Sequence, residues 1–235
     1  NIAKLFALDI SSGDLLWTNN NPAAFNSEIK IYKNYFFLID YENILRCFSV
    51  IDGKEIWNIK TENSILKSQK KLSIVIKDDK IIFNNSIGDI TAVDLFGNLI
   101  WIVPTSKNLN SSTTYFLKMS NLLINKDSVY FSTNMNEFYS LDINNGLTNW
   151  IQNVNSSLRS TIIDDMIFSV SDEGYLSIIN SNTGEIIRRT DIFSDMKAKK
   201  RKKIKATGFI VGIDKIYVSL SNGKIFIVDI KSGKT

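Results

Sequence analysis

The amino-acid sequence predicts an all-β fold, a β-propeller built from four-stranded antiparallel blades. All four tryptophans of the 235 residues lie four positions after a glycine, which is the first sign of an internal repeat. A polar, turn-forming residue recurs ahead of these glycines at spacings of 40, 45, 48, 38 and 49 residues, with a mean of 44. A period of about 40 to 50 residues is typical of propeller blades.

Six copies of the repeat are visible, and each has an anchor residue, a glycine and, in four copies, a tryptophan. The anchors are Asp9, Ser49, Asp94, Asp142, Asn180 and Asp229. The glycines are Gly13, Gly53, Gly97, Gly146, Gly184 and Gly233. The tryptophans are Trp17, Trp57, Trp101 and Trp150, and Arg188 stands at this position in the fifth copy. We interpret these residues as structural, because turns and packed cores account for all of them.

The repeat has a local physical explanation. The anchor side chain accepts backbone N–H groups of the following turn, and the glycine supplies the left-handed conformation that the turn requires. Six residues before five of the anchors stands another glycine or an asparagine, where a second hairpin turn is expected. These residues are Asn43, Gly88, Asn136, Gly174 and Gly223.

Short β-branched and aromatic runs separate the turns and predict four strands in each period. Residues 28–32 and 72–76 supply first strands, and residues 36–38, 81–83, 129–131, 167–168 and 216–218 supply second strands. Counted from Leu5, the chain contains the last two strands of one blade, four whole blades and three strands of another, twenty-one in total. We therefore expect one propeller domain over residues 1–235, about five blades' worth, as a fragment of a longer chain.

The composition is that of a globular domain, with 44% hydrophobic and 22% charged residues. The net charge is +4, and residues 197–205, the basic segment, carry seven positive charges, so the remaining surface is neutral or slightly acidic. Cys47 is the only cysteine and is expected to be a small buried residue. The chain opens with Asn1-Ile2-Ala3-Lys4, without a Met or a signal pattern, so we expect the natural N-terminus and any targeting or lipidation site to lie outside it.

The segment Ala7-Leu8-Asp9-Ile10-Ser11-Ser12-Gly13-Asp14-Leu15-Leu16-Trp17 resembles the PQQ-like, or quinoprotein-type, propeller repeat, and the resemblance covers essentially the whole chain. It implies that Trp17, Trp57, Trp101 and Trp150 each dock against the neighbouring blade. Within this superfamily the chain is most similar to the BamB family of periplasmic lipoproteins, partly through the stretch Ser157-Leu158-Arg159-Ser160-Thr161-Ile162-Ile163-Asp164. That resemblance implies part of an eight-bladed ring and a scaffold without a cofactor, which binds the barrel-inserting subunit of the outer-membrane assembly machinery in the periplasm.

No residue is assigned a catalytic, cofactor-binding or metal-binding role. The sequence has no histidine, which removes the commonest general base and metal ligand, and it has no glycine-rich phosphate loop. The carboxylate pairs Asp78-Asp79 and Asp164-Asp165 fall at hairpin turns, which explain them. The alternative function is that of a PQQ- and Ca²⁺-dependent quinoprotein dehydrogenase. That family carries adjacent cysteines and a cluster of calcium ligands, which this sequence does not show.

Two segments are predicted to bind a partner protein. One is Leu158-Arg159, where a large apolar residue beside an arginine has the composition of an interface anchor, although simple burial explains Leu158 equally well. The other lies in the basic segment and comprises Lys199, Lys200, Arg201, Lys202 and Lys203. A solvated loop is the plainest interpretation of these charges, and contact with an acidic protein or with anionic lipid is the sharper one. Nucleic acid is not expected as a partner, because no aromatic residues alternate with the charges.

Overall fold

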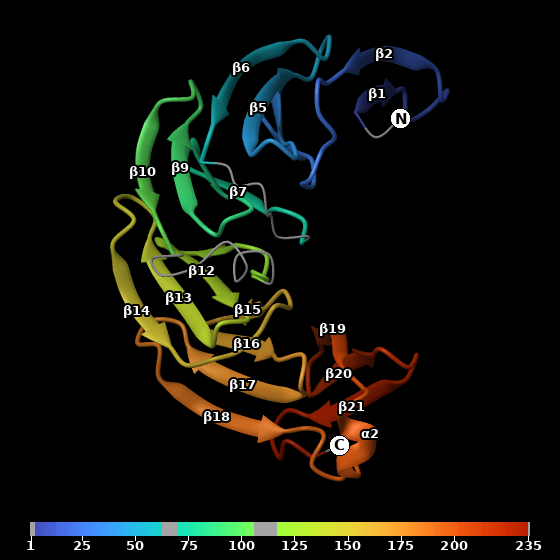
Figure 1. The fold of residues 1–235 in the computed structure, drawn as a ribbon, viewed down its shortest axis with the longest axis vertical. Coiled ribbons are helices and arrows are strands. Elements are labelled where there is room, and N and C mark those ends of the chain that lie inside the picture. Colours follow the sequence, from blue (N-terminus) through green and yellow to red (C-terminus); the bar gives the residue numbers. More distant parts are fainter. Residues whose placement is uncertain (1–2, 63–69, 106–116, 235) are drawn as a thin grey trace. The chain divides into compact units, whose positions relative to one another are not determined.

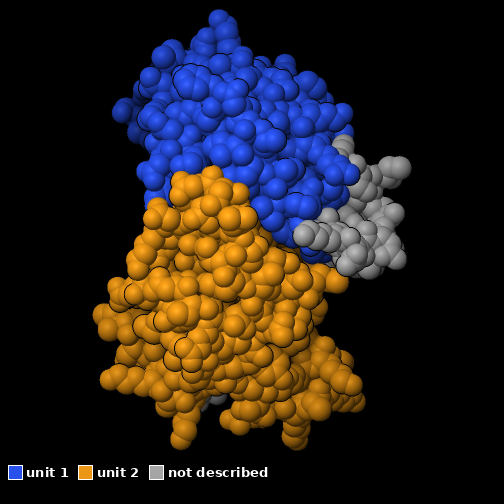
Figure 2. All heavy atoms as spheres, turned by 90° about the vertical axis from the view of Figure 1, so that its left-hand side faces the viewer, with its two compact units in different colours: residues 1–117 blue, residues 118–235 orange. Residues whose placement is uncertain are grey.

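The computed structural model describes residues 3–62, 70–105 and 117–234, and the fold is all-β (Figure 1). These residues form twenty-one strands in six antiparallel sheets, in agreement with the number expected from the repeat. Within each sheet only consecutive strands pair, as in a propeller blade. The chain divides into two compact units, Asn1–Leu117 and Lys118–Thr235, which Figure 2 colours separately.

The first unit contains a two-stranded sheet and two four-stranded sheets. The two-stranded sheet consists of β1 (Lys4–Leu8) and β2 (Leu15–Asn20). The second sheet consists of β3 (Lys30–Tyr32), β4 (Tyr35–Ile39), β5 (Ile44–Ser49) and β6 (Glu55–Lys60). The third consists of β7 (Ile74–Lys77), β8 (Lys80–Asn84), β9 (Ile90–Asp94) and β10 (Leu99–Val103).

The second unit contains two four-stranded sheets and a three-stranded sheet. The first consists of β11 (Leu123–Asn125), β12 (Ser128–Thr133), β13 (Glu137–Asp142) and β14 (Thr148–Gln152). The next consists of β15 (Thr161–Ile163), β16 (Met166–Val170), β17 (Tyr175–Asn180) and β18 (Ile186–Asp191). The third consists of β19 (Ala206–Val211), β20 (Lys215–Leu220) and β21 (Ile225–Asp229). A single helical turn, α2 (Ala198–Arg201), precedes it.

The strands confirm the prediction of four-stranded antiparallel blades. The size of the complete ring, and its organisation as one domain over residues 1–235, stay predictions. In the part of the chain that the structure describes, no helix has the length and hydrophobicity needed to cross a membrane.

The central strands β4 and β5 are buried on both faces, because another sheet of the same unit packs on each. On β4 and β5, Phe37 and Leu45 pack toward the β7–β10 sheet, whereas Phe36 and Phe48 pack toward β1 and β2. Cys47 lies in the same core, where burial raises the pKa of its thiol to about 12. Cys47 is therefore the small buried residue that the sequence predicts.

Anchor side chains close the turns as the repeat predicts. The Oδ1 atom of Asp9 accepts the backbone N–H groups of Ser11 and Ser12 at 2.9 and 2.8 Å. Asn180 accepts the equivalent pair from Asn182 and Thr183 through its amide oxygen. The second set of turn residues also adopts the expected conformation: φ is positive at Asn43, Gly88, Asn136, Gly174 and Gly223.

Tryptophan docking between neighbouring blades is confirmed for three copies. The indole N–H of Trp17 donates to the carbonyl of Val50 at 3.0 Å, directly after the next anchor. Trp57 donates to Leu95 at 2.9 Å, and Trp150 donates to Ser181 at 3.0 Å. Trp101 is buried, and its docking stays a prediction.

Arg188 makes the same connection without an indole. Its guanidinium donates to the carbonyl of Ile230, the residue directly after the sixth anchor, and to that of Lys231 at 2.7 Å. A planar cation with several N–H donors can reach two carbonyls where an indole reaches one. The fifth copy therefore keeps its contact with the following blade.

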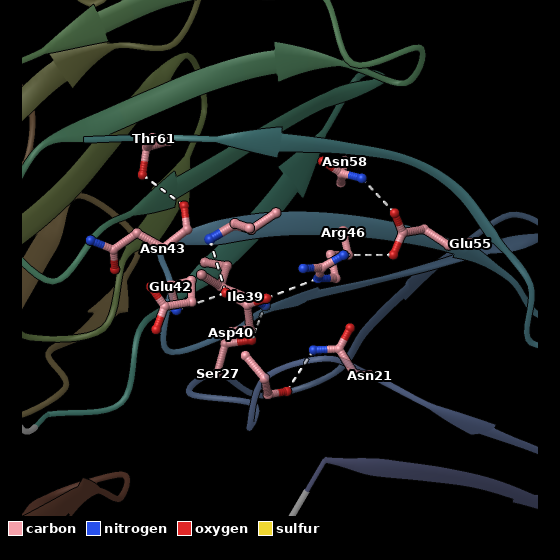
Figure 3. Close-up of polar contacts among 12 residues, drawn as sticks. Asn21, Ser27, Ile39, Asp40, Glu42, Asn43, Arg46, Glu55, Asn58 and Thr61 are labelled. Atoms are coloured by element: carbon pink, nitrogen blue, oxygen red, sulfur yellow. Dashed lines mark hydrogen bonds and ion pairs between the residues drawn. The ribbon is translucent and has the colours of Figure 1, made fainter. Parts of the chain in front are cut away.

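A buried ion-pair network runs across the β3–β6 sheet, from the residue after β4 to the first residue of β6 (Figure 3). Arg46 donates to Asp40 at 2.9 Å and to Glu55 at 2.8 Å. The Asp40 side chain is fully buried and also accepts the backbone N–H groups of Glu42 and Ile44. Burial lowers the pKa of Arg46, but the hydrogen bonds to Glu55 and Asp40 outweigh it and raise the pKa above its ordinary value. Every charge of the network thus has a partner, as burial requires.

The first prediction compares two glycines with the same backbone and different surroundings. Gly13 and Gly53 have φ values of +77° and +68°, so alanine is strained at both. A Cβ at Gly53 would lie 2.5 Å from Cε3 of Trp17, whereas a Cβ at Gly13 meets nothing within 4 Å. We expect Gly13→Ala to cost about 1 kcal/mol of unfolding free energy, and Gly53→Ala to cost about 2 kcal/mol more, because the indole must move. Denaturant unfolding measures both, and equal losses would contradict the docking role.

The second prediction concerns the buried network. Arg46→Met should lower the unfolding free energy by about 3 to 5 kcal/mol, because it leaves the Asp40 carboxylate buried without a cation. Glu55→Gln should cost less than about 1 kcal/mol, since Glu55 is 30% exposed. The double variant Arg46→Met/Asp40→Asn should recover part of the loss, because a neutral amide still accepts the turn N–H groups. No recovery in the double variant would argue against an uncompensated charge as the cause.

The third prediction concerns acid stability. Backbone N–H groups hold the pKa of Asp9 and Asp229 below the ordinary value of 3.8. The stabilisation is complete above that value and is lost as pH falls through the lower folded-state pKa. Asparagine accepts the same bonds without titrating, as Asn180 does, so Asp9→Asn/Asp229→Asn should reduce the fall in Tm between about pH 6 and about pH 2.5. Circular dichroism measures this fall, with Asp195→Asn as an exposed control outside the repeat turns, and an unchanged fall would refute the explanation.

Candidate functional site

Leu158 and Arg159 lie in the loop between β14 and β15, residues 153–160, which is held closely to the fold. Ser156 Oγ donates to the carbonyl of Val170 at 2.8 Å, and Ser157 Oγ donates to Asp172 Oδ1 at 3.0 Å. Leu158 is half-buried and packs against the core between the β15–β18 and β19–β21 sheets. Arg159 is exposed. Within this pair, the arginine presents the more accessible side chain.

The basic segment follows β18 and contains α2. Arg201 differs from its neighbours because it points back to the sheet: Nη1 lies 2.6 Å from Asp191 Oδ2, and the guanidinium lies 5.3 Å from the centre of the Tyr175 ring. The lysines of the segment are exposed, and within the described residues no ion pair engages them. They are Lys197, Lys199, Lys200, Lys202, Lys203 and Lys205. The segment is thus a cationic surface in which the Arg201 side chain is held against the sheet.

The hairpin between β16 and β17, residues 171–174, connects the two predicted segments. Its Asp172 accepts the Ser157 hydroxyl through the side chain, and it accepts the backbone N–H of Ala206 at 3.0 Å through its carbonyl. Leu158 and Met196 also pack against the same core cluster. The structure therefore brings Leu158, Arg159 and the basic segment to the same end of the second unit, which their separation in sequence did not indicate.

Beside this hairpin lies a polar cavity of about 440 Å³. One wall comes from β17 and β18 and carries Tyr175, Ser177 and Arg189. The rest of the lining is contributed by the hairpins and by the loop after β14: Asn136, Asn153, Val154, Asn155, Ser171 and Glu173. Sequence reasoning missed this cavity because its lining comes from four separate stretches of the sequence. The alternation of polar residues at 175 and 177 and at 189 and 191 is the one local sign of a polar sheet face.

Polar contacts cross the cavity without filling it. Arg189 Nη2 donates to the carbonyl of Asn153 at 2.5 Å, and Arg189 Nε donates to Ser177 Oγ at 3.4 Å. Asn155 Nδ2 donates to Glu173 Oε1 at 3.5 Å. One cation, one carboxylate and three amide side chains therefore surround the space together with the apolar surface of Val154 and the Tyr175 ring, so the lining suits a ligand that carries both polar and apolar atoms.

The carboxylate pairs at the other hairpins are part of the packing between sheets. Asp79 binds Lys33 Nζ at 2.6 Å and the Tyr32 hydroxyl at 2.9 Å, and these partners hold the pKa of its carboxyl below the ordinary value. Asp165 forms the equivalent pair with Lys126 at 2.7 Å. Asp79 and Asp165 therefore lie in turns, as expected, and each also forms an ion pair with the neighbouring sheet.

A quinone with Ca²⁺ does not fit the residues present. Calcium requires about six to eight oxygen ligands in one place. Among the described residues, no three side chains of the His, Cys, Asp and Glu types gather closely enough to hold a metal ion. We therefore derive no chemistry through such a group.

Comparisons with known proteins support the same family. The family model described as outer membrane protein assembly factor BamB matches residues 2–190. BamB from Moraxella catarrhalis has a TM-score of 0.79 at 17% identity, over 98% of this chain and 68% of that one. The C-terminal WD40 domain of Sif2 has a TM-score of 0.70 at 15% identity, over 97% of this chain and 61% of that one. No curated protein matches the sequence.

A europium-containing methanol dehydrogenase also matches, with a TM-score of 0.60 at 12% identity, over 80% of this chain and 47% of the enzyme. At such identities the structural matches show the fold alone, because scaffolds and enzymes share this architecture. The family model is the specific finding, since it covers most of the chain. The chain belongs to the BamB family of outer-membrane protein assembly factors.

Proposed function

We propose that this chain is part of a non-catalytic, protein-binding scaffold that assists the assembly of outer-membrane β-barrel proteins. The observation that carries the proposal is the family match over residues 2–190. Its place of action is then the periplasm, at the outer membrane, where the intact protein is anchored as a lipoprotein. The partner is the barrel-assembly subunit, through its periplasmic repeats.

The end of the second unit supports this proposal. Arg159 is exposed on a loop fixed by hydrogen bonds, so the side chain is presented from a rigid support. The basic segment leads directly into Ala206, whose N–H binds the same hairpin, and its lysines are exposed and form no ion pair with any residue that the structure describes. A rigid arginine suits the centre of an interface, whereas mobile exposed charges act mainly on the rate of encounter. The two segments therefore have different kinetic roles in the proposed complex.

The fourth prediction tests these roles with the purified chain and the periplasmic repeats of the barrel-assembly subunit. Changing Lys199, Lys200, Lys202 and Lys203 to glutamine should slow association about three- to tenfold at low salt, with a smaller effect at high salt. Arg159→Ala should instead speed dissociation about tenfold. Surface-immobilised binding kinetics separate the two rates.

Lys215→Gln/Lys231→Gln is the matched control, since it removes exposed lysines of the same unit at the end of β20 and β21 opposite to the hairpin that binds Lys205. Unchanged kinetics in both test variants would leave the basic segment as solvated surface. Failure of the parent chain to bind the subunit would contradict the proposed function itself. Binding to vesicles containing phosphatidylglycerol, lost with the four lysines, would assign the segment to anionic lipid.

A further inference from the structure

The polar cavity begins where apolar packing between two blades stops. On the face of β17 that meets the β11–β14 sheet, Ile179 is buried in a cluster with Tyr130 and Phe138. Two and four residues earlier on the same face stand Ser177 and Tyr175. Small and polar side chains at these two positions cannot continue the apolar core. The space between the sheets therefore opens toward the β16–β17 hairpin.

The equivalent place in the first unit is filled. Arg46 and Ser177 occupy the same position of the repeat, three residues after the turn residues Asn43 and Gly174. Arg46 reaches Asp40 and Glu55 and is nearly buried. In the second unit the arginine stands on the outer strand instead, since Arg189 lies opposite Ser177. The β15–β18 blade therefore has an open cavity where the β3–β6 blade has the buried Arg46 side chain.

The cavity wall and the basic segment are physically joined. Tyr175 lies opposite Asp191 across β17 and β18, and these two residues hold Arg201 by ring contact and by an ion pair. Because Tyr175 also lines the cavity, α2 lies at its rim. The basic segment is thus linked to the cavity wall through the contact between Arg201 and Tyr175.

The chemistry of this surface indicates what it binds. Each asparagine side chain offers a donor and an acceptor, which match the alternating groups of an extended polypeptide main chain. The lysines attract carboxylates, whereas a base would meet one aromatic ring in the cavity lining, Tyr175, which the Arg201 guanidinium already contacts. A cavity of about 440 Å³ is also within the usual range for a bound ligand or side chains.

We propose that the polar cavity and the basic segment form one binding site for an extended, acidic segment of a partner protein. Its main chain or a polar side chain enters the cavity, and its carboxylates lie over the lysines. Arg201 is a positioning residue, which Asp191 and Tyr175 hold so that the basic segment stays at the cavity rim. The inference rests on the proposed function, because it names the chemistry by which the scaffold recognises a partner.

The fifth prediction uses the full chain and a fluorescein-labelled decapeptide of Asp, Glu, Ser and Gly. Fluorescence anisotropy should show saturable binding, and the peptide with Asn and Gln in place of its acidic residues should bind at least about tenfold more weakly. Ser177→Leu fills the cavity from the β17 wall without a change of charge and should weaken binding at least about tenfold. Asn155→Trp fills it from the opposite loop and should do the same, so the test survives if one variant folds poorly.

Controls separate the cavity from the charges. Ser219→Leu makes the same chemical change on exposed β20 and should leave the affinity unchanged. The four-lysine variant should lose affinity mainly at low salt, whereas the cavity variants should lose it at every salt concentration. Asp191→Asn frees Arg201 and should weaken binding about threefold to fivefold while the cavity remains intact. Circular dichroism verifies the fold of each variant.

Three results would overturn the inference: parental peptide affinity in both cavity variants, equal binding of the acidic and neutral peptides, or binding only to phosphatidylglycerol vesicles or a single-stranded oligonucleotide. The proposed function is judged separately with the barrel-assembly subunit. If the subunit binds the parent and both cavity variants equally, the cavity proposal fails and the scaffold proposal stands. If only the acidic peptide binds, in a cavity-dependent way, the scaffold partner is wrong and the site stands.

Discussion

The contact between an outer strand of one blade and the turn of the next is the interaction on which each unit depends. Backbone hydrogen bonds within the sheets pair only consecutive strands, and a few more, such as that from Ala206 N–H to the carbonyl of Asp172, join one blade to the next. Side chains add a repeated connection, since Trp17, Trp57, Trp150 and Arg188 all donate to the carbonyl directly after an anchor. The anchor orders that turn, and the glycine lets the aromatic ring approach the backbone. The tryptophan of one blade and the anchor and glycine of the next therefore form one repeated contact between two blades.

Along each central strand, the apolar residues that stabilise the fold and the polar residues near the hairpins lie in different places. Buried apolar residues on the central strands hold neighbouring sheets together, and the tryptophans close their outer edge. The hairpin ends carry less of this packing, so polar residues are tolerated there if they find partners. In the first unit such residues are Arg46, Asp40 and Glu55, which satisfy one another. In the second unit an open cavity lies beside the β16–β17 hairpin, and its lining carries Arg189, Glu173 and three asparagines.

The sequence predicts the fold better than the site, because the turns depend on residues close together in the sequence and the site depends on residues far apart. Turn residues act on neighbours within a few positions, so Asn43, Asn136 and the anchors could be recognised one by one. Leu158 shows the limit of this reasoning: the sequence leaves an interface residue and a buried residue equally possible, and the structure shows a half-buried side chain that packs against the core. Arg201 shows another limit. In the sequence it is one of several basic residues in a row, and only the structure shows that Asp191 and Tyr175 hold its side chain against the sheet.

The sequence by itself determined the all-β fold, the blade period, the strand count and the conformation of the turns, because a repeat states each local requirement several times. The family resemblance also follows from those repeated residues. Tertiary structure alone decided that Arg188 replaces an indole, that the loop of Arg159 and the basic segment share one hairpin, and that a cavity lies beside them. These features join residues from several strands and loops, and their energies depend on distances that no local pattern records. A single-sequence pattern can therefore define the blade, whereas the site exists only once neighbouring blades have packed.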